Sequence, residues 1–171
     1  KLSYAKNILV KNNKDPAIIF KSENNYKTIL SWQELNLKVA KISNWMRFVG
    51  IKKGDRVAAY LPNIPEAVIA YISTSVVGAV WSSCSPDFGT KSVIDRFSQI
   101  EPRILFIGEI YFYNGKKINI LERLNEIIKN VPSINKVVIV PYPGKKINIK
   151  NNIKKNIYNW NKLINLEKNT K

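Results

Sequence analysis

The residues that could bind a ligand gather in two segments that are rich in polar and aromatic side chains. Residues 82–89 (SSCSPDFG) supply hydroxyl groups and the carboxylate of Asp87. Residues 108–117 (GEIYFYNGKK) supply aromatic rings, then an Asn-Gly pair typical of a chain reversal, and then Lys116 and Lys117. Because ammonium groups pair well with phosphate oxygens, the second segment favours an anionic ligand.

Both segments also allow a purely structural interpretation. Ser82, Ser83 and Ser85 can satisfy backbone groups in a turn, and Asp87 can cap the helix that follows it. The Asn-Gly pair can be an ordinary tight turn with solvated lysines. The residue pattern alone leaves both interpretations open.

Composition excludes several kinds of catalysis. The chain has no histidine, which excludes Ser/His/Asp and Cys/His units and every histidine metal site. The one cysteine, Cys84, can form neither an internal disulfide nor a cysteine metal cage, and is expected to be a small buried hydrophobe. No G-x-G-x-x-G motif occurs, and the spacing from Gly108 to Gly115-Lys116 is too long for a P-loop. The residues of this chain therefore form no recognisable ATP site.

The chain is strongly basic, with 28 Lys and Arg against 12 Asp and Glu and a formal net charge of +16. Such a charge is typical of nucleic-acid binding, so a non-catalytic basic binding domain is kept as an alternative function. However, residues 55–109 carry 4 basic and 6 acidic side chains, and Lys (23), Asn (21) and Ile (25) make up 69 of the 171 residues. All three have A/T-rich codons, so a genome-wide base bias accounts for the lysines. We therefore expect no nucleic-acid partner.

The hydrophobic pattern predicts an α/β fold, a parallel βαβ layer preceded by a short helix and a β-hairpin. The short helix is expected within residues 2–10, and the hairpin at residues 17–20 and 26–30. A capping box at Ser31 and Glu34 then starts a helix that ends at Gly50.

The rest of the layer is predicted as strands and helices in alternation. Apolar strands are expected at residues 57–61, 79–83, 104–107 and 137–140, with helices at 65–77, 90–100 and 120–130. Ligands of such sheets bind at the carboxyl ends of the strands, which selects the loops at residues 62–64, 82–89 and 108–117.

The domain organisation is predicted from the change in composition. Residues 1–143 are expected to belong to one domain, and the Lys/Asn-rich residues 144–171 to start a further subdomain or form a loosely attached segment with one short helix. Because the first residue is Lys1 rather than methionine, we expect a partial chain. The longest apolar run, residues 67–80, has 14 residues, fewer than the about 18 that a membrane helix needs, so no membrane segment is expected.

Several short motifs and one long run resemble the adenylate-forming acyl-CoA synthetases. The motifs are YAKNIL (4–9), DPAI (15–18), SWQEL (31–35), KGDRV (53–57) and YNGK (113–116), and the run covers residues 61–106. Within that run, residues 81–89 are most similar to the members that activate acetoacetate. The resemblance extends over residues 2–143.

This resemblance implies a reaction in which ATP with Mg²⁺ adenylates a carboxylate and the CoA sulfur then displaces AMP. The expected function is that of an N-terminal fragment, inactive alone, of an AMP-forming acetoacetate–CoA ligase; another short- or medium-chain acyl-CoA synthetase is the alternative. The resemblance further implies a cytoplasmic enzyme of lipid and ketone-body metabolism. Its expected partners are CoA, acetoacetate, ATP and the missing C-terminal portion of the same chain.

By the same resemblance, CoA binding falls on residues of two loops: Ser85, Pro86, Asp87, Tyr113, Asn114, Gly115 and Lys116. Related acetyl-CoA synthetases have arginines where this chain has Tyr113 and Lys116, so the phosphate contact is expected from Lys116 or Lys117. No catalytic residue, ATP-binding residue or metal ligand is assigned within the chain.

Overall fold

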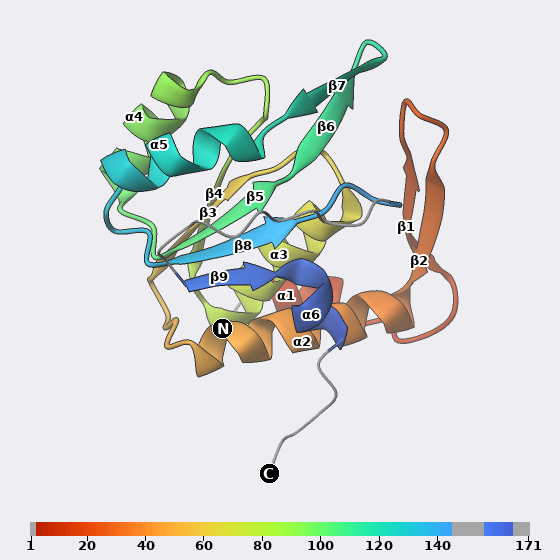
Figure 1. The fold of residues 1–171 in the computed structure, drawn as a ribbon. Helices are drawn as coiled ribbons and strands as arrows, with labels where there is room; N and C mark the ends of the chain where they lie inside the picture. Colours follow the sequence, from red (N-terminus) through yellow and green to blue (C-terminus); the bar gives the residue numbers. More distant parts are fainter. Residues whose placement is uncertain (1–2, 145–155, 166–171) are drawn as a thin grey trace.

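The computed structural model describes residues 3–144 and 156–165 and confirms the predicted α/β fold. In these residues five parallel strands form one sheet in the order β4-β3-β5-β8-β9 (Figure 1). The strands are Arg56–Tyr60 (β3), Val80–Cys84 (β4), Ile104–Gly108 (β5), Lys136–Val140 (β8) and Asn156–Asn159 (β9). Because β3 lies between β4 and β5, the strand order reverses beside β3, as in a doubly wound sheet.

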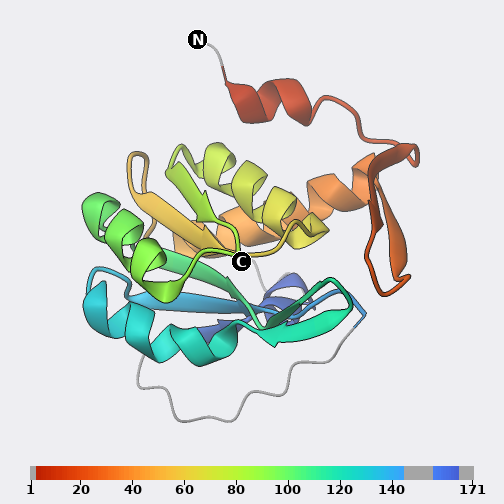
Figure 2. The same ribbon diagram turned by 90° about the horizontal axis from the view of Figure 1, so that it is seen from above.

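Helices cover both faces of this sheet, as Figures 1 and 2 show. One face carries α2 (Trp32–Phe48), α3 (Pro65–Val77) and α6 (Trp160–Asn165). The other carries α4 (Thr90–Ile100) and α5 (Leu124–Asn130), which follows the 3₁₀ turn η1 (Leu121–Arg123). The short helix α1 (Tyr4–Ile8) packs against α3. Covered in this way, every residue of β5 is buried, which explains the uninterrupted apolar sequence of that strand.

Phe106 of β5 lies at the centre of the hydrophobic core. Its ring contacts the rings of Trp45, Trp81 and Trp160, with centroids 6.4, 6.3 and 6.0 Å away. Burial of a side chain of this size stabilises the fold by about 1.5–3 kcal/mol. The aromatic cluster therefore joins α2, β4, β5 and α6 in one core.

The N-terminal elements form as the sequence predicts. β1 (Pro16–Lys21) and β2 (Lys27–Ser31) make an antiparallel hairpin, and Asn25 in its turn has a φ of 61°. At the start of α2, the Ser31 hydroxyl accepts a hydrogen bond from the Glu34 N–H at 3.2 Å, and the Glu34 carboxylate accepts one from the Ser31 N–H at 2.8 Å. These two bonds confirm the capping box, and the Ser31 backbone and hydroxyl groups lower the pKa of Glu34.

The prediction of a loop at residues 108–117 is wrong. The segment forms a second antiparallel hairpin from β6 (Ile110–Tyr113) and β7 (Lys116–Asn119). Its reversal lies at Asn114 and Gly115, with φ values of 50° and 72°, the left-handed pair that a two-residue hairpin turn requires. The aromatic run before the turn has high β propensity, which favours a strand over a loop.

A fifth strand follows residue 140, where the sequence analysis predicts none. β9 pairs in parallel with β8, and the expected short helix begins only at Trp160. Trp160 and Leu163 of α6 are buried, and the Lys41 ammonium group donates to the Ile164 carbonyl oxygen at 2.6 Å. The rest of the Lys/Asn-rich segment, residues 145–155 and 166–171, lies outside the described residues.

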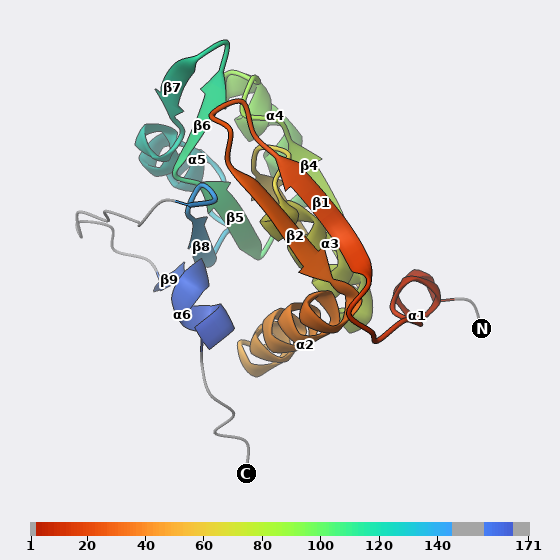
Figure 3. The ribbon, with the colours of Figure 1, turned by 90° about the vertical axis from the view of Figure 1, so that its right-hand side faces the viewer.

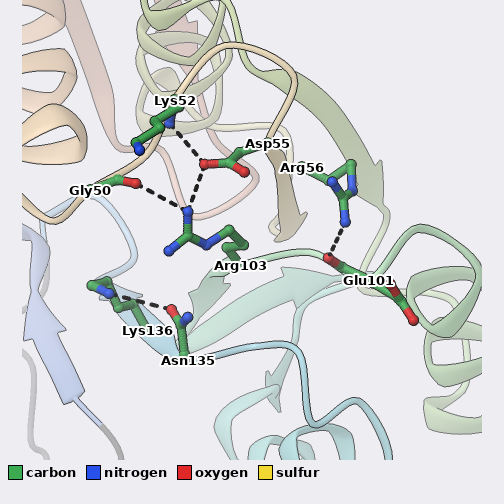
Figure 4. Close-up of polar contacts among 8 residues, drawn as sticks. All are labelled: Gly50, Lys52, Asp55, Arg56, Glu101, Arg103, Asn135 and Lys136. Atoms are coloured by element: carbon green, nitrogen blue, oxygen red, sulfur yellow. Dashed lines mark hydrogen bonds and ion pairs between the residues drawn. The ribbon is translucent and has the colours of Figure 1, made fainter.

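A polar network fastens the amino ends of the strands, opposite the predicted ligand edge (Figure 4). Arg103 donates to the Asp55 carboxylate at 2.8 Å and to the Gly50 carbonyl oxygen at 3.1 Å, and Asp55 also accepts the Lys52 N–H at 2.8 Å. Burial raises the pKa of Asp55, but the Lys52 N–H and the Arg103 guanidinium lower it, and the net pKa lies below its ordinary value.

Within residues 3–144 and 156–165, no helix is both long enough and apolar enough to cross a membrane.

Candidate functional site

A cavity of about 320 Å³ opens at the carboxyl edge of the sheet, where the sequence predicts ligand binding. It lies between the β1–β2 hairpin, the loops after β3 and β4, and the β6–β7 hairpin, which stand side by side in Figure 3. Its lining is mostly aromatic and polar: Phe20, Lys21, Ser22, Glu23, Pro62, Asn63, Ile64, Ser85, Pro86, Asp87, Tyr111, Phe112, Tyr113 and Tyr142.

Gly108, the last residue of β5, lies close to the loop after β3. A Cβ atom at this position would lie 3.0 Å from Ile120 Cδ1 and 3.1 Å from Pro62 Cδ. These approaches are tighter than ordinary packing, so a side chain at residue 108 would require Ile120 or Pro62 to shift by a few tenths of an ångström. The absence of a side chain at Gly108 therefore lets the loop after β3 pack closely on the end of β5.

The side chains of Tyr60 and Arg123 donate hydrogen bonds to the backbone of the loop after β4. The buried Tyr60 hydroxyl lies 2.7 Å from the Phe88 carbonyl oxygen and 3.2 Å from that of Pro86. Arg123 Nη1 lies 3.0 Å from each of the same two carbonyl oxygens and also donates to the Tyr60 hydroxyl. The backbone on both sides of Asp87 is therefore fixed by side chains of β3 and η1.

Asp87 joins this loop to the β6–β7 hairpin. Its carboxylate accepts the Tyr111 hydroxyl at 3.1 Å and the Ser85 hydroxyl at 2.8 Å. The interpretation of Asp87 as the cap of the next helix is wrong, because the N-cap of α4 is Gly89 and no side chain caps that helix. Asp87 instead ties together the two segments that the sequence analysis selects.

The tip of the β6–β7 hairpin reaches the tip of the β1–β2 hairpin. The Gly115 N–H donates to Glu23 Oε2 at 3.3 Å. Tyr113 is 60% exposed, and Lys116 is its cross-strand partner. Since directly opposed residues of an antiparallel pair share a face, Lys116 lies on the same face of the hairpin as Tyr113, which lines the cavity.

The predicted CoA-binding residues come from these two neighbouring segments. Ser85, Pro86, Asp87 and Tyr113 line the cavity. Asn114, Gly115 and Lys116 lie at the exposed hairpin tip beside it and are not part of its lining. Cys84, by contrast, is buried, and burial raises the pKa of its thiol, in agreement with its expected packing role.

Two phenols of the site are held in their protonated form. Burial raises the pKa of Tyr60, an effect that the neighbouring Arg123 opposes. Burial and the hydrogen bond to Asp87 raise the pKa of Tyr111. Both hydroxyl groups therefore remain hydrogen-bond donors at neutral pH.

Sequence reasoning missed Tyr60, Arg123 and Glu23. Arg123 is 63 residues from Tyr60 along the chain, and Glu23 is 92 from Gly115, so no local pattern joins these partners. The Asn-Gly pair within an aromatic run was the one signal that could have placed Tyr111 on a hairpin strand.

The described residues do not fit a metal centre. In residues 3–144 and 156–165, no group of three or more His, Cys, Asp or Glu side chains lies close enough together to hold an ion. The cavity instead combines aromatic rings and hydroxyl groups with Lys21 and the carboxylates of Glu23 and Asp87. The aromatic rings suit an organic ligand with a flat ring system, and Lys21 and the neighbouring Lys116 are the cations that could pair with its anionic groups.

Known proteins with similar sequences include several acyl-CoA synthetases. The acetoacetyl-CoA synthetase of Mus musculus is 42% identical over 153 residues, which are 87% of this chain, and that of Rhizobium meliloti (strain 1021) is 41% identical over 144 residues, 84% of this chain. The malonamoyl-CoA synthetase of Penicillium aethiopicum is 37% identical over 124 residues.

A solved structure, that of acetoacetyl-CoA synthetase from Streptomyces lividans, matches 97% of this chain with a TM-score of 0.86 and 35% identity. The chain spans 25% of that protein and 23% and 22% of the mouse and Rhizobium relatives. The matched proteins are thus about four times longer than the sequence that they share with this chain.

A sequence model described as AMP-binding enzyme matches residues 7–167. That match covers nearly all of the described sheet, its helices and both hairpins, and the chain therefore belongs to the family of AMP-binding enzymes.

Proposed function

We propose that this chain is the N-terminal part of an ATP-dependent acetoacetate–CoA ligase. The observation that carries the proposal is the 42% identity with acetoacetyl-CoA synthetase over 87% of the chain. In this proposal residues 1–143 form part of the N-terminal domain of the enzyme. ATP and Mg²⁺ are assigned to residues outside this chain, because its own sequence has no P-loop and its described residues have no acidic cluster.

The part that this chain would play is to bind the nucleotide end of CoA in the cavity at the carboxyl edge of the sheet. Aromatic side chains such as Tyr113 offer a stacking surface for adenine. Lys116 shares a face with Tyr113, so its ammonium group could pair with a phosphate bound at the same place. The hydrogen bond from the Tyr111 hydroxyl to Asp87 Oδ1, with an oxygen–oxygen distance of 3.1 Å, supports a shared site because it joins the loop after β4 to the β6–β7 hairpin.

The reason to favour acetoacetate over other acids is the activity named for the similar proteins. The mouse, Rhizobium and Streptomyces matches are acetoacetyl-CoA synthetases, whereas the Penicillium match at 37% identity is a malonamoyl-CoA synthetase. Both names describe ligases of short acids with a second carbonyl group. The acyl pocket itself is not among the residues assigned here.

The experiment has two stages. Sequencing beyond the codon for Lys171 is expected to find an in-frame continuation with a Ser/Thr/Gly-rich loop, and the intact gene product is then purified. We expect AMP formation that requires both CoA and acetoacetate, with acetate and butyrate as much poorer substrates. A preference for butyrate would support a different acyl-CoA synthetase, and the absence of AMP formation with all three acids would overturn the proposal.

A further inference from the structure

We propose that Arg123 is a positioning residue that holds the CoA-binding loop, residues 85–88, in its binding conformation. This inference rests on the proposed function, because it assigns a role to Arg123 in that same site. Arg123 does not line the cavity, and its effect on CoA is exerted through the backbone that carries Asp87.

A single nitrogen atom of Arg123 serves three acceptors. Nη1 lies 3.0 Å from the Pro86 and Phe88 carbonyl oxygens and also contacts the Tyr60 hydroxyl. The hydrogen atoms can be accounted for. Nη1 carries two hydrogen atoms for these three acceptors, so one hydrogen is shared between two of them, and the Tyr60 hydroxyl donates in addition to the Phe88 carbonyl oxygen at 2.7 Å.

The two carbonyl groups flank Asp87, so their orientation sets the direction of its side chain. That side chain accepts the Tyr111 hydroxyl and thereby fixes the spacing between the loop and the β6–β7 hairpin. Arg123 follows that hairpin in the chain, in the turn η1. The Arg123 guanidinium contacts the loop after β4 directly, and its backbone in η1 follows the β6–β7 hairpin, so this one residue links the two segments that line the cavity.

The contacts of Arg123 differ from those of an ordinary surface ion pair. It donates to two backbone carbonyls and a buried phenol, and its guanidinium carbon lies 5.9 Å from the centre of the Tyr60 ring. Hydrogen bonds from a charged donor are stronger than neutral ones, and they lose less to solvent at a partly buried position. Loss of the charge is therefore expected to release the loop.

The test uses the intact enzyme and the variant Arg123→Met, which keeps an unbranched stem as far as the position of Nε but removes every side-chain donor. We expect the KM for CoA to rise about five- to tenfold, while kcat and the KM values for ATP and acetoacetate stay within about twofold. Arg123→Lys is expected to restore most of the CoA affinity, because an ammonium group has three donors for the same acceptors. The matched control is Arg47→Met, which removes a guanidinium that donates to the Val76 carbonyl oxygen on α3, away from the cavity.

Two results would overturn the inference: a KM for CoA that Arg123→Met leaves unchanged, or an equal rise in Arg47→Met. If Arg123→Met does not fold, Tyr60→Phe removes only the hydroxyl group of the same network, and its KM for CoA must rise in the same selective manner. Failure of the proposed function is distinguishable, since the wild-type enzyme would then form no acetoacetyl-CoA at all. Exchange of pyrophosphate into ATP without CoA is expected to be unaffected by Arg123→Met, which separates CoA binding from adenylation.

Discussion

Lys116 and Lys117 are adjacent lysines with different surroundings. Lys116 opposes Tyr113 and Lys117 opposes Phe112 in the β6–β7 hairpin, and neighbouring residues of a strand point to opposite faces. Tyr113 and Phe112 both line the candidate cavity, but Lys117 also lines a separate cavity together with Glu109 and Asn119, whereas Lys116 does not. Sequence alone could not choose between these lysines, because the choice depends on the register of the hairpin.

We predict that Lys116→Ala in the intact enzyme raises the KM for CoA more than the KM for ATP. An exposed ammonium–phosphate contact contributes about 1 kcal/mol, so the expected rise is about fivefold. Lys117→Ala is the matched comparison and is expected to have a smaller effect. Dephospho-CoA, which lacks the 3′-phosphate, shows which phosphate Lys116 contacts: the difference between wild type and Lys116→Ala disappears for a contact to the 3′-phosphate and persists for a contact to the diphosphate. Equal effects on CoA and ATP would contradict the assignment.

Asp55 provides a test at the opposite edge of the sheet. Its pKa is lowered in the folded chain, so its contribution to stability is present above its ordinary unfolded pKa and is lost as the pH falls through the folded pKa. We predict that Asp55→Ala lowers the free energy of unfolding by about 1–2 kcal/mol at pH 7, since the ion pair with Arg103 is partly exposed. In urea denaturation, the difference from wild type should shrink steadily below pH 4; a constant difference down to pH 2 would contradict the role of its charge.

At the scale of elements, the β6–β7 hairpin depends on a left-handed turn. Gly115 has a φ of 72° with nothing near the place of a Cβ atom, so an alanine there meets backbone strain but no clash. We predict that Gly115→Ala costs about 1 kcal/mol of stability and also raises the KM for CoA by shifting Lys116. Gly54 has a φ of 86° and equally open surroundings near the amino edge of the sheet, so Gly54→Ala should cost the same stability with no change in the KM for CoA.

Most elements formed from local signals could be predicted, although the β6–β7 hairpin with its local Asn-Gly signal was expected to be a loop, and elements formed by distant pairing could not be predicted. The capping box of α2 and the apolar strand β5 follow from neighbouring residues, and both were predicted. β9 has the sequence NIYN, which has no strong propensity, and it becomes a strand because its backbone pairs with β8. The candidate site shows the same division. The positions of its loops could be predicted because they follow the strand ends, whereas the hydrogen bond between Arg123 and Tyr60 joins residues that are far apart in the sequence and could not be predicted.

At the scale of the whole molecule, the net charge of +16 suggests nucleic-acid binding, but its distribution does not. The central residues 55–109 carry more acidic than basic side chains, so the excess of positive charge lies toward the two ends of the chain. We predict only weak binding of a labelled 20-base-pair DNA to the purified chain. Fluorescence anisotropy at 50 and 200 mM salt should show no saturation at micromolar protein; tight binding that weakens steeply with salt would favour the basic-domain alternative.

The 171 residues can be tested for catalysis by themselves. Adenylation requires groups that bind the triphosphate, its metal ion and the carboxylate together, and this chain has neither a phosphate-binding glycine loop nor, among its described residues, an acidic metal cluster. The residues proposed to bind CoA, by contrast, all lie within this chain. We therefore expect the isolated chain to bind CoA weakly and to catalyse no exchange of pyrophosphate into ATP with acetoacetate and Mg²⁺, whereas the intact gene product catalyses it. Exchange by the isolated chain above the rate of a protein-free blank would contradict this division, because the groups that activate the carboxylate would then lie within residues 1–171.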